Sequence, residues 1–413
     1  MRTALLLTVG LVGSVGAADW AQWRGPNRDG MSKETGLLKE WPKDGPKLVW
    51  QANDVGTGYG AVAVARDRVY LIANKGDEES VTALNAKDGK PVWSTPLGKV
   101  GNPKQRPSYP CARSTPTVDG DKLYALGSDG DLACLDAVTG KAVWTKSLRK
   151  DFAGMPGQWA YAESPLVDGD TLVVTPGGSE ATLAALNKKT GETIWKAPVP
   201  GGDPAGYASV VITDAAGVKQ YVQFLSKGVV GVDAKTGKFL WRFNGTTGNT
   251  NIPTPVAADG LVYTSQGRPG GGGAVKLVST GGEVKAEKVY QERDLPSSIG
   301  GQVLINGNLY GTTPNALECV EFTTGKPKWT EKSVGASSVI FADGRLYLHG
   351  ENGQIVMAEA SPEKYVEKGR FTPPGRPKAV NNGEKAWAYP ALADGKLYVR
   401  EHGAVWCYDV KGQ

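Results

Sequence analysis

The chain contains two histidines, and their placement is the first hint of chemistry. His349 and His402 each lie between two predicted strands, in equivalent loops of neighbouring segments. Two imidazoles on adjacent loops could bind a metal ion or share proton transfer. Neither histidine belongs to a spaced ligand motif, and the sequence fixes no carboxylate beside them. We therefore favour the simpler interpretation, in which they are two unrelated polar loop residues.

Other candidate binding residues lie in loops that precede predicted strands. Arg113 and Glu163 occupy equivalent loops of adjacent segments, where they could grip a polar ligand or pair with each other, and we favour pairing. Trp159 and Tyr161 lie in a Gly- and Pro-bearing loop. They could form an aromatic wall for a sugar or peptide, although packing of that loop is the simpler expectation.

Three common reaction classes lack their motifs. The chain has no Gly-x-Ser-x-Gly turn for a nucleophilic serine, and Cys111 has no evident His or Asn partner for thiol chemistry. A Gly-x-Gly-x-x-Gly motif between a strand and a helix is also missing. The sequence therefore gives no support to serine-type, thiol-type or nucleotide-dependent chemistry.

One recurring phrase defines the elements that position these loops. A glycine after Thr or Asp is followed four residues later by tryptophan, at Trp93, Trp144, Trp195, Trp241 and Trp329. The successive intervals are 51, 51, 46 and 88 residues. Because the last interval is about twice the others, it should contain one further, degenerate copy of the repeat. Repeats of 40–50 residues without a helical pattern are typical of a β-propeller with four-stranded blades.

A repeated hairpin gives the number of blades as eight. Its copies lie at 62–70, 116–124, 165–173, 210–221, 255–263, 302–310, 338–347 and 390–398, and most turn on Asp-Gly or Asn-Gly. The outer strands should end at Trp93, Trp144, Trp195, Trp241, Val289, Trp329 and Val366. The last hairpin lacks an outer strand, and residues 47–51 with Trp50 should supply it. This latch would leave no open edge.

The first residues have a different composition from the rest. Residues 1–18 combine Arg2, a short apolar run and a small-residue exit, which predicts a cleaved signal peptide without a lipoprotein cysteine. We expect an irregular arm at 19–46 and the propeller domain at 47–413. The run is too interrupted for a transmembrane anchor. The mature protein should therefore be a periplasmic or secreted monomer without a membrane segment.

The charge distribution and the cysteine positions give further information about partners and disulfides. Charged residues make up 22% of the chain with a net charge of +5 and form no polybasic run, so we expect no nucleic-acid partner. Cys134, Cys319 and Cys407 share one repeat position with Ala83, Ala185, Gly231 and Ala358. A position restricted to small residues implies close packing between sheets. We expect these cysteines to be buried and unpaired, and Cys111 has no evident disulfide partner.

The repeat unit Leu-x-Cys/Ala-Leu-Asp/Asn-x-x-Thr-Gly-x-x-x-Trp, found at 132–144 and 183–195, resembles that of the pyrroloquinoline quinone (PQQ) repeat family. This family includes quinoprotein alcohol dehydrogenases and non-enzymatic relatives of the BamB type. The resemblance covers residues 47–410 and implies an eight-bladed, all-β propeller. It also implies that a tryptophan docks each blade onto the next. These tryptophans are Trp50, Trp93, Trp144, Trp195, Trp241 and Trp329.

The resemblance allows the residues that bind PQQ and calcium in quinoprotein dehydrogenases to be looked for in this sequence. Quinoprotein dehydrogenases use a pair of adjacent cysteines, but residues 109–113 contain only Cys111. Their calcium ligands imply Glu180 together with Asn249 or Asn251 here, whereas Ser298 stands where an Asp is required. Calcium prefers six to eight oxygens and proton abstraction needs a base, so the site is incomplete.

We therefore predict an exported, non-catalytic scaffold without a cofactor that binds a protein, peptide or glycan. The alternative is a PQQ- and calcium-dependent dehydrogenase with a reduced site. A third class is an enzyme of another type that uses the histidines or Arg113 and Glu163. Successive strands of a blade alternate in direction. The loop before each inner strand and the turn between the second and third strands therefore lie on the same face of the ring. The candidate ligand-binding residues on that face are Arg113, Trp159, Glu163, Asn251, His349 and His402.

Overall fold

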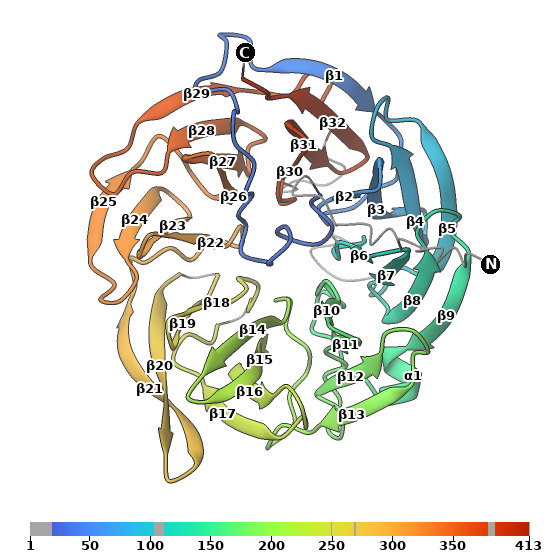
Figure 1. The fold of residues 1–413 in the computed structure, drawn as a ribbon, viewed down its shortest axis with the longest axis vertical. Coiled ribbons are helices and arrows are strands. Elements are labelled where there is room, and N and C mark those ends of the chain that lie inside the picture. The colour runs from blue at the N-terminus through green and yellow to red at the C-terminus, as the bar shows by residue number, and fades with distance from the viewer. Residues whose placement is uncertain (1–18, 103–110, 249, 268–269, 379–384, 413) are drawn as a thin grey trace, which may run out of the picture.

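The computed structural model describes residues 19–102, 111–248, 250–267, 270–378 and 385–412. Over these residues the chain forms eight antiparallel sheets of four strands, arranged in a ring (Figure 1). The prediction of an eight-bladed β-propeller is confirmed. The predicted signal peptide at 1–18 lies outside the described residues. Within the described part, no helix has the length and apolar character needed to cross a membrane.

Within each blade the four strands lie side by side, with the first strand nearest the centre of the ring and the fourth on its rim (Figure 1). Blades one to four consist of β2 (Ala63–Ala65), β3 (Arg68–Lys75), β4 (Glu78–Asn85), β5 (Pro91–Lys99); β6 (Thr117–Asp119), β7 (Lys122–Leu126), β8 (Asp131–Asp136), β9 (Ala142–Ser147); β10 (Leu166–Asp168), β11 (Thr171–Val174), β12 (Leu183–Asn187), β13 (Thr193–Ala197); β14 (Val211–Ala215), β15 (Val218–Leu225), β16 (Gly228–Asp233) and β17 (Phe239–Phe243). One short helix, α1 (Leu148–Phe152), follows blade two.

Blades five to eight repeat the arrangement. They consist of β18 (Val256–Ala258), β19 (Leu261–Ser265), β20 (Gly272–Thr280), β21 (Glu283–Glu292); β22 (Gln302–Ile305), β23 (Asn308–Thr312), β24 (Leu317–Glu321), β25 (Pro327–Glu331); β26 (Ser337–Ala342), β27 (Arg345–Gly350), β28 (Ile355–Glu359), β29 (Glu367–Phe371); and β30 (Ala391–Ala393), β31 (Lys396–Glu401), β32 (Ala404–Asp409), β1 (Lys47–Ala52).

The inner hairpins turn as their sequences predict. Asp343 and Gly344 connect β26 to β27 with φ angles of 47° and 78°. Positive φ at both central residues is the geometry of a type I′ turn, which matches the twist of paired strands. The Asp-Gly dipeptide is therefore well suited to the local backbone.

The ring closes through a strand from the start of the described chain. β1 pairs antiparallel with β32, and Trp50 lies opposite Cys407. The predicted latch is confirmed, and Figure 1 shows β1 on the rim of the last blade. The cysteine prediction is also confirmed, because Cys134, Cys319 and Cys407 are buried and free.

Tryptophan docking between blades follows from glycines in the neighbouring turns. Gly191 has a φ of 75°, and a Cβ atom there would lie 2.9 Å from the Trp144 ring of the preceding blade. Gly89 meets Trp50 in the same way across the closure. A side chain at these glycines would clash with the ring as well as strain the backbone.

Blades four, five and seven depart from the predicted pattern. The indole Nε1 of Trp241 donates to Gln220 Oε1 of its own blade at 2.7 Å, so this ring is anchored differently from the others. In blade five, Tyr290 takes the tryptophan position opposite Ala274 and contacts Gly325 of blade six. The docking position is therefore one residue after Val289, and the prediction that outer strands end at the docking rings was wrong, since β21 continues to Glu292 and β5 continues past Trp93 to Lys99.

In blade seven the prediction was wrong at two positions. Met357 lies opposite Gly369, so the small-residue position is not Ala358, and Val366 precedes the outer strand β29. Gly369 cannot supply a docking ring because it has no side chain. The space above it is filled from elsewhere in the chain.

Trp41 of the 19–46 arm fills this place. Its backbone N–H donates to Lys368 O at 2.8 Å, and its ring lies 6.0 Å from that of Tyr347 and 5.0 Å from that of Phe371. The tryptophans of other blades contact a tyrosine in the same manner, as Trp144 contacts Tyr124 at 6.2 Å. The arm therefore supplies the missing aromatic residue of blade seven.

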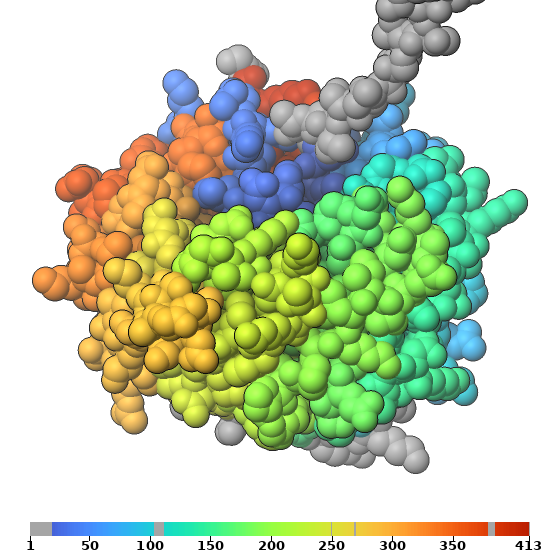
Figure 2. Space-filling model, turned by 60° about the horizontal axis from the view of Figure 1, so that its bottom comes forward, coloured from blue at the N-terminus to red at the C-terminus, as the bar shows by residue number. Residues whose placement is uncertain are grey.

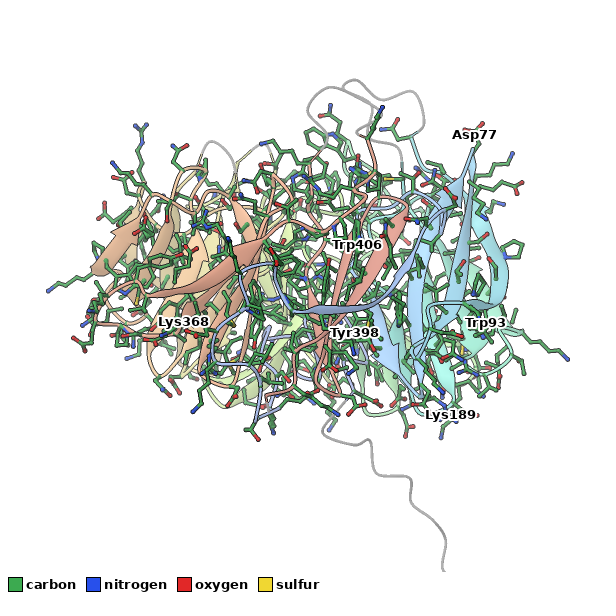
Figure 3. All side chains as sticks on the ribbon, turned by 90° about the horizontal axis from the view of Figure 1, so that it is seen from above. Asp77, Trp93, Lys189, Lys368, Tyr398 and Trp406 are labelled. Atoms are coloured by element: carbon green, nitrogen blue, oxygen red, sulfur yellow. The ribbon has the colours of Figure 1, made fainter. Side chains whose placement is uncertain are left out.

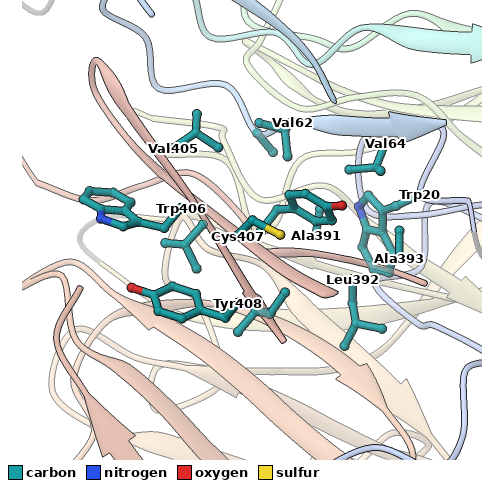
Figure 4. Close-up of a cluster of buried hydrophobic side chains, with 14 of the residues drawn as sticks. Trp20, Val62, Val64, Ala391, Leu392, Ala393, Val405, Trp406, Cys407 and Tyr408 are labelled. Carbon is teal, nitrogen blue, oxygen red and sulfur yellow. The ribbon is translucent and has the colours of Figure 1, made fainter. Parts of the chain in front are cut away.

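The rest of the arm packs across one face of the ring. Trp20 forms a bridge with Val64 of β2, and Met31 forms one with Phe341 of β26. Figure 2 shows the arm in dark blue seated among the blades, and Figure 4 shows Trp20 in the apolar cluster between blades one and eight. Between these two bridges, Arg24 and Arg28 enter the centre of the ring and are buried.

Candidate functional site

A cavity lies at the centre of the ring, among the loops that precede the inner strands. We call the face that carries the β3–β4 turn the loop face; Figure 3 shows the ring from its edge, with Asp77 of that turn on one side and Lys189 on the other. The cavity has a volume of about 300 Å³. Its lining residues are Trp23, Tyr59, Ala61, Arg113, Trp159, Ala162, Tyr207, Ser209, Thr250, Ile252, Thr254, Ile299, Lys385, Trp387 and Tyr389.

Six aromatic rings dominate the wall and form three edge-to-face pairs. The pairs are Tyr59–Trp387 at 4.8 Å and 60°, Trp159–Tyr207 at 5.6 Å and 69°, and Trp23–Tyr389 at 5.6 Å and 77°. The pairs come from different blades and from the arm, so closure of the ring brings them together. Edge-to-face contact holds each ring in place and leaves ring faces and edges for a ligand.

Guanidinium groups brace several of these rings. The Arg24 Cζ atom lies 5.4 Å from the Trp23 ring and 5.6 Å from the Tyr389 ring, and Arg28 Cζ lies 5.4 Å from Trp23. Arg113 lies 5.5 Å from Tyr59. Cation–π attraction stabilises these contacts, and the cations make the potential around the cavity more positive.

Arg28 and Glu163 are two buried ionisable groups beneath the cavity. Burial lowers the pKa of Arg28 to about 9, although the negative charge of Glu163 opposes this shift. The Arg28 guanidinium donates to the backbone oxygens of Ser164 at 2.8 Å and Val210 at 3.1 Å. Arg28 therefore ties the arm to the starts of the inner strands of blades three and four.

Glu163 is engaged by neighbours other than Arg113. Its carboxylate accepts hydrogen bonds from the Thr175 hydroxyl at 2.7 Å and from Gln223 Nε2 at 3.1 Å. Burial raises the pKa of Glu163 to about 7, although these hydrogen bonds and the Arg28 charge pull it down. The favoured pairing of Arg113 with Glu163 was therefore wrong, since Arg113 lines the cavity and Glu163 is buried below it.

The two histidines have separate environments. His349 is fully buried, with Nδ1 2.9 Å from Ala388 O and Nε2 3.5 Å from a carboxylate oxygen of Glu401. Burial pushes the pKa of Glu401 up, but hydrogen bonds with His349 and Arg376 outweigh this and lower it. His402 instead packs edge-to-face against Tyr59 at 5.4 Å. Among the described residues, no three His, Cys, Asp or Glu side chains are placed to hold a metal.

The residues implied as calcium ligands do not fit a calcium and PQQ site. Asn251 Nδ2 donates to Leu225 O at 2.7 Å and its Oδ1 accepts from Gly248 N at 2.9 Å, so its amide is used by the backbone. Glu180 is exposed and does not line the cavity, and Asn249 lies outside the described residues. Cys111 is buried, which raises the pKa of its thiol to about 12.

The structure thus brings Arg113 and Trp159 together in the cavity, with His402 behind one wall residue. Glu163, Asn251 and His349 are buried supports of the surrounding loops. Tyr161 is also a core residue, and its hydroxyl donates to Pro176 O at 2.8 Å.

Of the residues that line the cavity, the candidate list contained Arg113 and Trp159, and the residues that it missed include Trp23, Lys385 and Trp387. Trp23 comes from the arm, and no local pattern indicates that it reaches the centre of the ring. Lys385 and Trp387 precede β30 in the same kind of loop as Arg113, so their position was available as a signal. Both contact Glu351, with the Trp387 Nε1 atom donating at 3.1 Å and Lys385 forming an ion pair.

Comparison with known proteins shows the family to which the chain belongs. The family described as outer membrane protein assembly factor BamB matches residues 31–109 and 77–331. BamB of Burkholderia pseudomallei is 24% identical over 291 residues, which are 66% of this chain and 66% of that protein. Tetrathionate hydrolase of Acidithiobacillus ferrooxidans is 26% identical over 352 residues, 73% of this chain and 64% of that protein. The chain thus spans about two thirds of the length of these relatives.

A solved structure extends the likeness of fold. Quinohemoprotein alcohol dehydrogenase ADHIIG of Pseudomonas putida superposes with a TM-score of 0.65 at 12% identity, covering 96% of this chain and 81% of that one. At this identity the likeness concerns the fold alone. Proteins with the same propeller fold thus include an assembly factor and enzymes, and the site must decide between these functions.

Proposed function

The chain belongs to the family of PQQ-repeat propellers described as outer membrane protein assembly factor BamB, and from this premise we propose that it is an exported, non-catalytic scaffold that binds a segment of a partner protein in its central cavity. The observation that carries the proposal is the braced aromatic wall. Three interlocked ring pairs around about 300 Å³ form a surface suited to burying an apolar side chain.

The energetics favour binding by burial. An aromatic side chain that enters such a cavity removes roughly 150–250 Å² from water, which corresponds to about 4–6 kcal/mol before the entropic cost of association. The wall rings are already held by one another and by arginines, so little ordering is needed when a ligand binds. This preorganisation is the expected property of a recognition site.

The titratable groups near the cavity support the non-catalytic interpretation. A general base must reach the proton that it removes. The Glu163 carboxylate is occupied by Thr175 and Gln223, and His349 is buried beside Glu401. These groups position loops and strands, while the lining itself offers mostly rings and hydroxyls.

The proposed location follows from the sequence and the family. We place the mature protein in the periplasm or outside the cell, after removal of residues 1–18. Its partner would therefore be an exported or envelope protein.

A binding screen with a cavity variant tests the proposal. Labelled wild-type protein and the Trp159→Ala variant are applied to a displayed peptide library and to a glycan array. We expect peptides to be enriched by the wild type and lost with Trp159→Ala. Phe239→Ala, a partly buried aromatic of β17 outside the cavity, serves as the control and should retain binding. Peptide binding that does not depend on Trp159 would overturn the proposed site.

The dehydrogenase alternative has its own readout. The purified protein is mixed with PQQ and calcium, and the absorption of a bound quinone and dye-linked alcohol oxidation are measured. A stoichiometric quinone spectrum with alcohol oxidation would replace the scaffold proposal with the enzyme. Enrichment of glycans without peptides would change the class of partner.

A further inference from the structure

The charge and polarity of the cavity lining indicate which part of a partner protein could bind there. Among the described residues, its lining contains two cations, Arg113 and Lys385, and no Asp, Glu, Asn or Gln side chain. Lys385 is paired with Glu351, and Arg113 also donates to Cys111 O at 2.9 Å. Arg24 and Arg28 add positive charge beneath the wall, which the Glu163 carboxylate opposes in part. An anionic group is therefore favoured over a cationic one.

The floor of the cavity restricts the ligand in a second way. Trp23 of the arm lines the cavity and is only 8% exposed. It packs against Tyr389, and the buried Arg24 lies within cation–π distance of both rings. The arm then continues across the ring to Met31 at β26. A peptide can therefore enter the cavity from the loop face, but it cannot pass through the floor.

The geometry points to a chain end as the occupant. Resting on the function proposed above, we propose that the cavity binds the C-terminal residue of a peptide, with an aromatic side chain among the rings and the α-carboxylate at Arg113. An internal segment would need two exits, and an N-terminal ammonium would be repelled. A guanidinium is well suited to a carboxylate because it donates in a planar fork.

The same lining argues against a sugar as the ligand. Sugar hydroxyl groups need several hydrogen-bonding partners when they are buried, since an unpaired polar group is costly. Among the described residues that line this cavity there is no amide or carboxylate side chain, so apart from the cations the polar groups are indole N–H groups and hydroxyls of Ser, Thr and Tyr. The T-shaped ring pairs instead allow an additional aromatic ring to continue the edge-to-face pattern.

Fluorescence anisotropy with matched peptides tests this inference. The probe is a fluorescein-labelled Gly/Ser octapeptide that ends in Phe with a free carboxylate. Its partners are the C-terminal amide, a peptide ending in Ala and one with Phe in the middle. We expect the amide to bind about tenfold more weakly, as for the loss of one charge-assisted hydrogen bond. The Ala and internal-Phe peptides should also bind at least tenfold more weakly.

Substitutions of Arg113 test whether this residue binds the α-carboxylate. Arg113→Gln should reduce binding of the free acid to the level of the amide, and Arg113→Lys should restore part of the difference. Arg293→Gln, which changes an exposed arginine of the loop after β21, should behave as the wild type. Unchanged melting temperatures would show that the variants fold.

The outcomes separate this inference from the proposed function. If acid, amide and internal-Phe peptides bind wild type equally and Trp159→Ala abolishes all of them, the chain-end inference is wrong and the scaffold proposal stands. If binding is unaffected by Trp159→Ala, both are wrong. Direct binding of PQQ or glucuronate to the wild type, with no binding of any of the peptides, would also overturn the chain-end inference.

Discussion

Replacement of Trp41 by alanine should destabilise the propeller at a blade that does not contain Trp41. The ring is 6% exposed and takes the place of the tryptophan that blade seven lacks above Gly369. Its neighbours Tyr347 and Phe371 belong to the second and fourth strands of that blade. The substitution would therefore remove a contact that connects the arm to the sheet, in addition to opening a void.

The magnitude follows from the buried area. A tryptophan buries roughly 150–250 Å², and observed costs of truncating large buried aromatics are about 3–5 kcal/mol. The indole Nε1 of Trp41 is buried and has no hydrogen-bond partner among the described residues, so its removal also relieves a penalty. We therefore expect about 3 kcal/mol. With about 2.1 cal/mol/K of unfolding entropy per residue, a chain of this size should lose roughly 4 °C in Tm.

Differential scanning calorimetry measures this loss, and limited proteolysis followed by mass spectrometry locates it. Trp41→Phe should recover much of the stability because a smaller ring can still contact Tyr347. Leu48→Ala, at a residue 37% exposed on β1, should change Tm by less than about 1 °C. An equal Tm for Trp41→Ala and wild type, together with unchanged cleavage in the arm, would refute the assigned docking role.

Other predictions concern closure, thiols and pH. Deletion of residues 47–51 removes most of β1 and exposes the edge of β32, so size-exclusion chromatography should show aggregation; an unaltered profile and melting curve would contradict the latch. Thiol labelling after denaturation, read by mass spectrometry, should find Cys134, Cys319 and Cys407 unpaired. The raised pKa of Glu163, about 7, means that the folded state keeps a proton that the unfolded state loses above its ordinary pKa of about 4.3. Stability should therefore fall as pH rises from about 4.5 to 7, by on the order of 2–3 kcal/mol from this group. Glu163→Gln should show a smaller difference in Tm between pH 5 and 8, and an identical pH dependence would argue against this role.

The fold was predictable because its signals are local. Each blade repeats a hairpin with a defined turn and a Gly-to-Trp spacing, so the pattern is visible within about 50 residues. The errors occurred where a blade lacks the expected tryptophan. Tyr290 substitutes for tryptophan in blade five, and Trp41 reaches blade seven from far away in sequence. A spacing pattern cannot show such a substitution.

The site was predictable only in part, because a loop position does not specify the direction of a side chain. Arg113 and Trp159 line the cavity, whereas Glu163 turns into the interior to meet Thr175 and Gln223. All lie in loops before inner strands, and the difference arises from tertiary packing. The identification of Trp23 as the floor required knowledge of the path of the arm.

The arm makes stability and binding interdependent. Trp41 completes blade seven, and Trp23 of the same segment forms the cavity floor, so release of the arm would remove the floor. A ligand that binds only when the floor is present must stabilise the docked arm by linkage. The free-acid Phe peptide should therefore slow proteolysis between residues 19 and 46, and Trp41→Ala should weaken peptide binding although Trp41 does not line the cavity. If the peptide binds Trp41→Ala as tightly as wild type while cleavage of the arm is accelerated, the site does not depend on the arm.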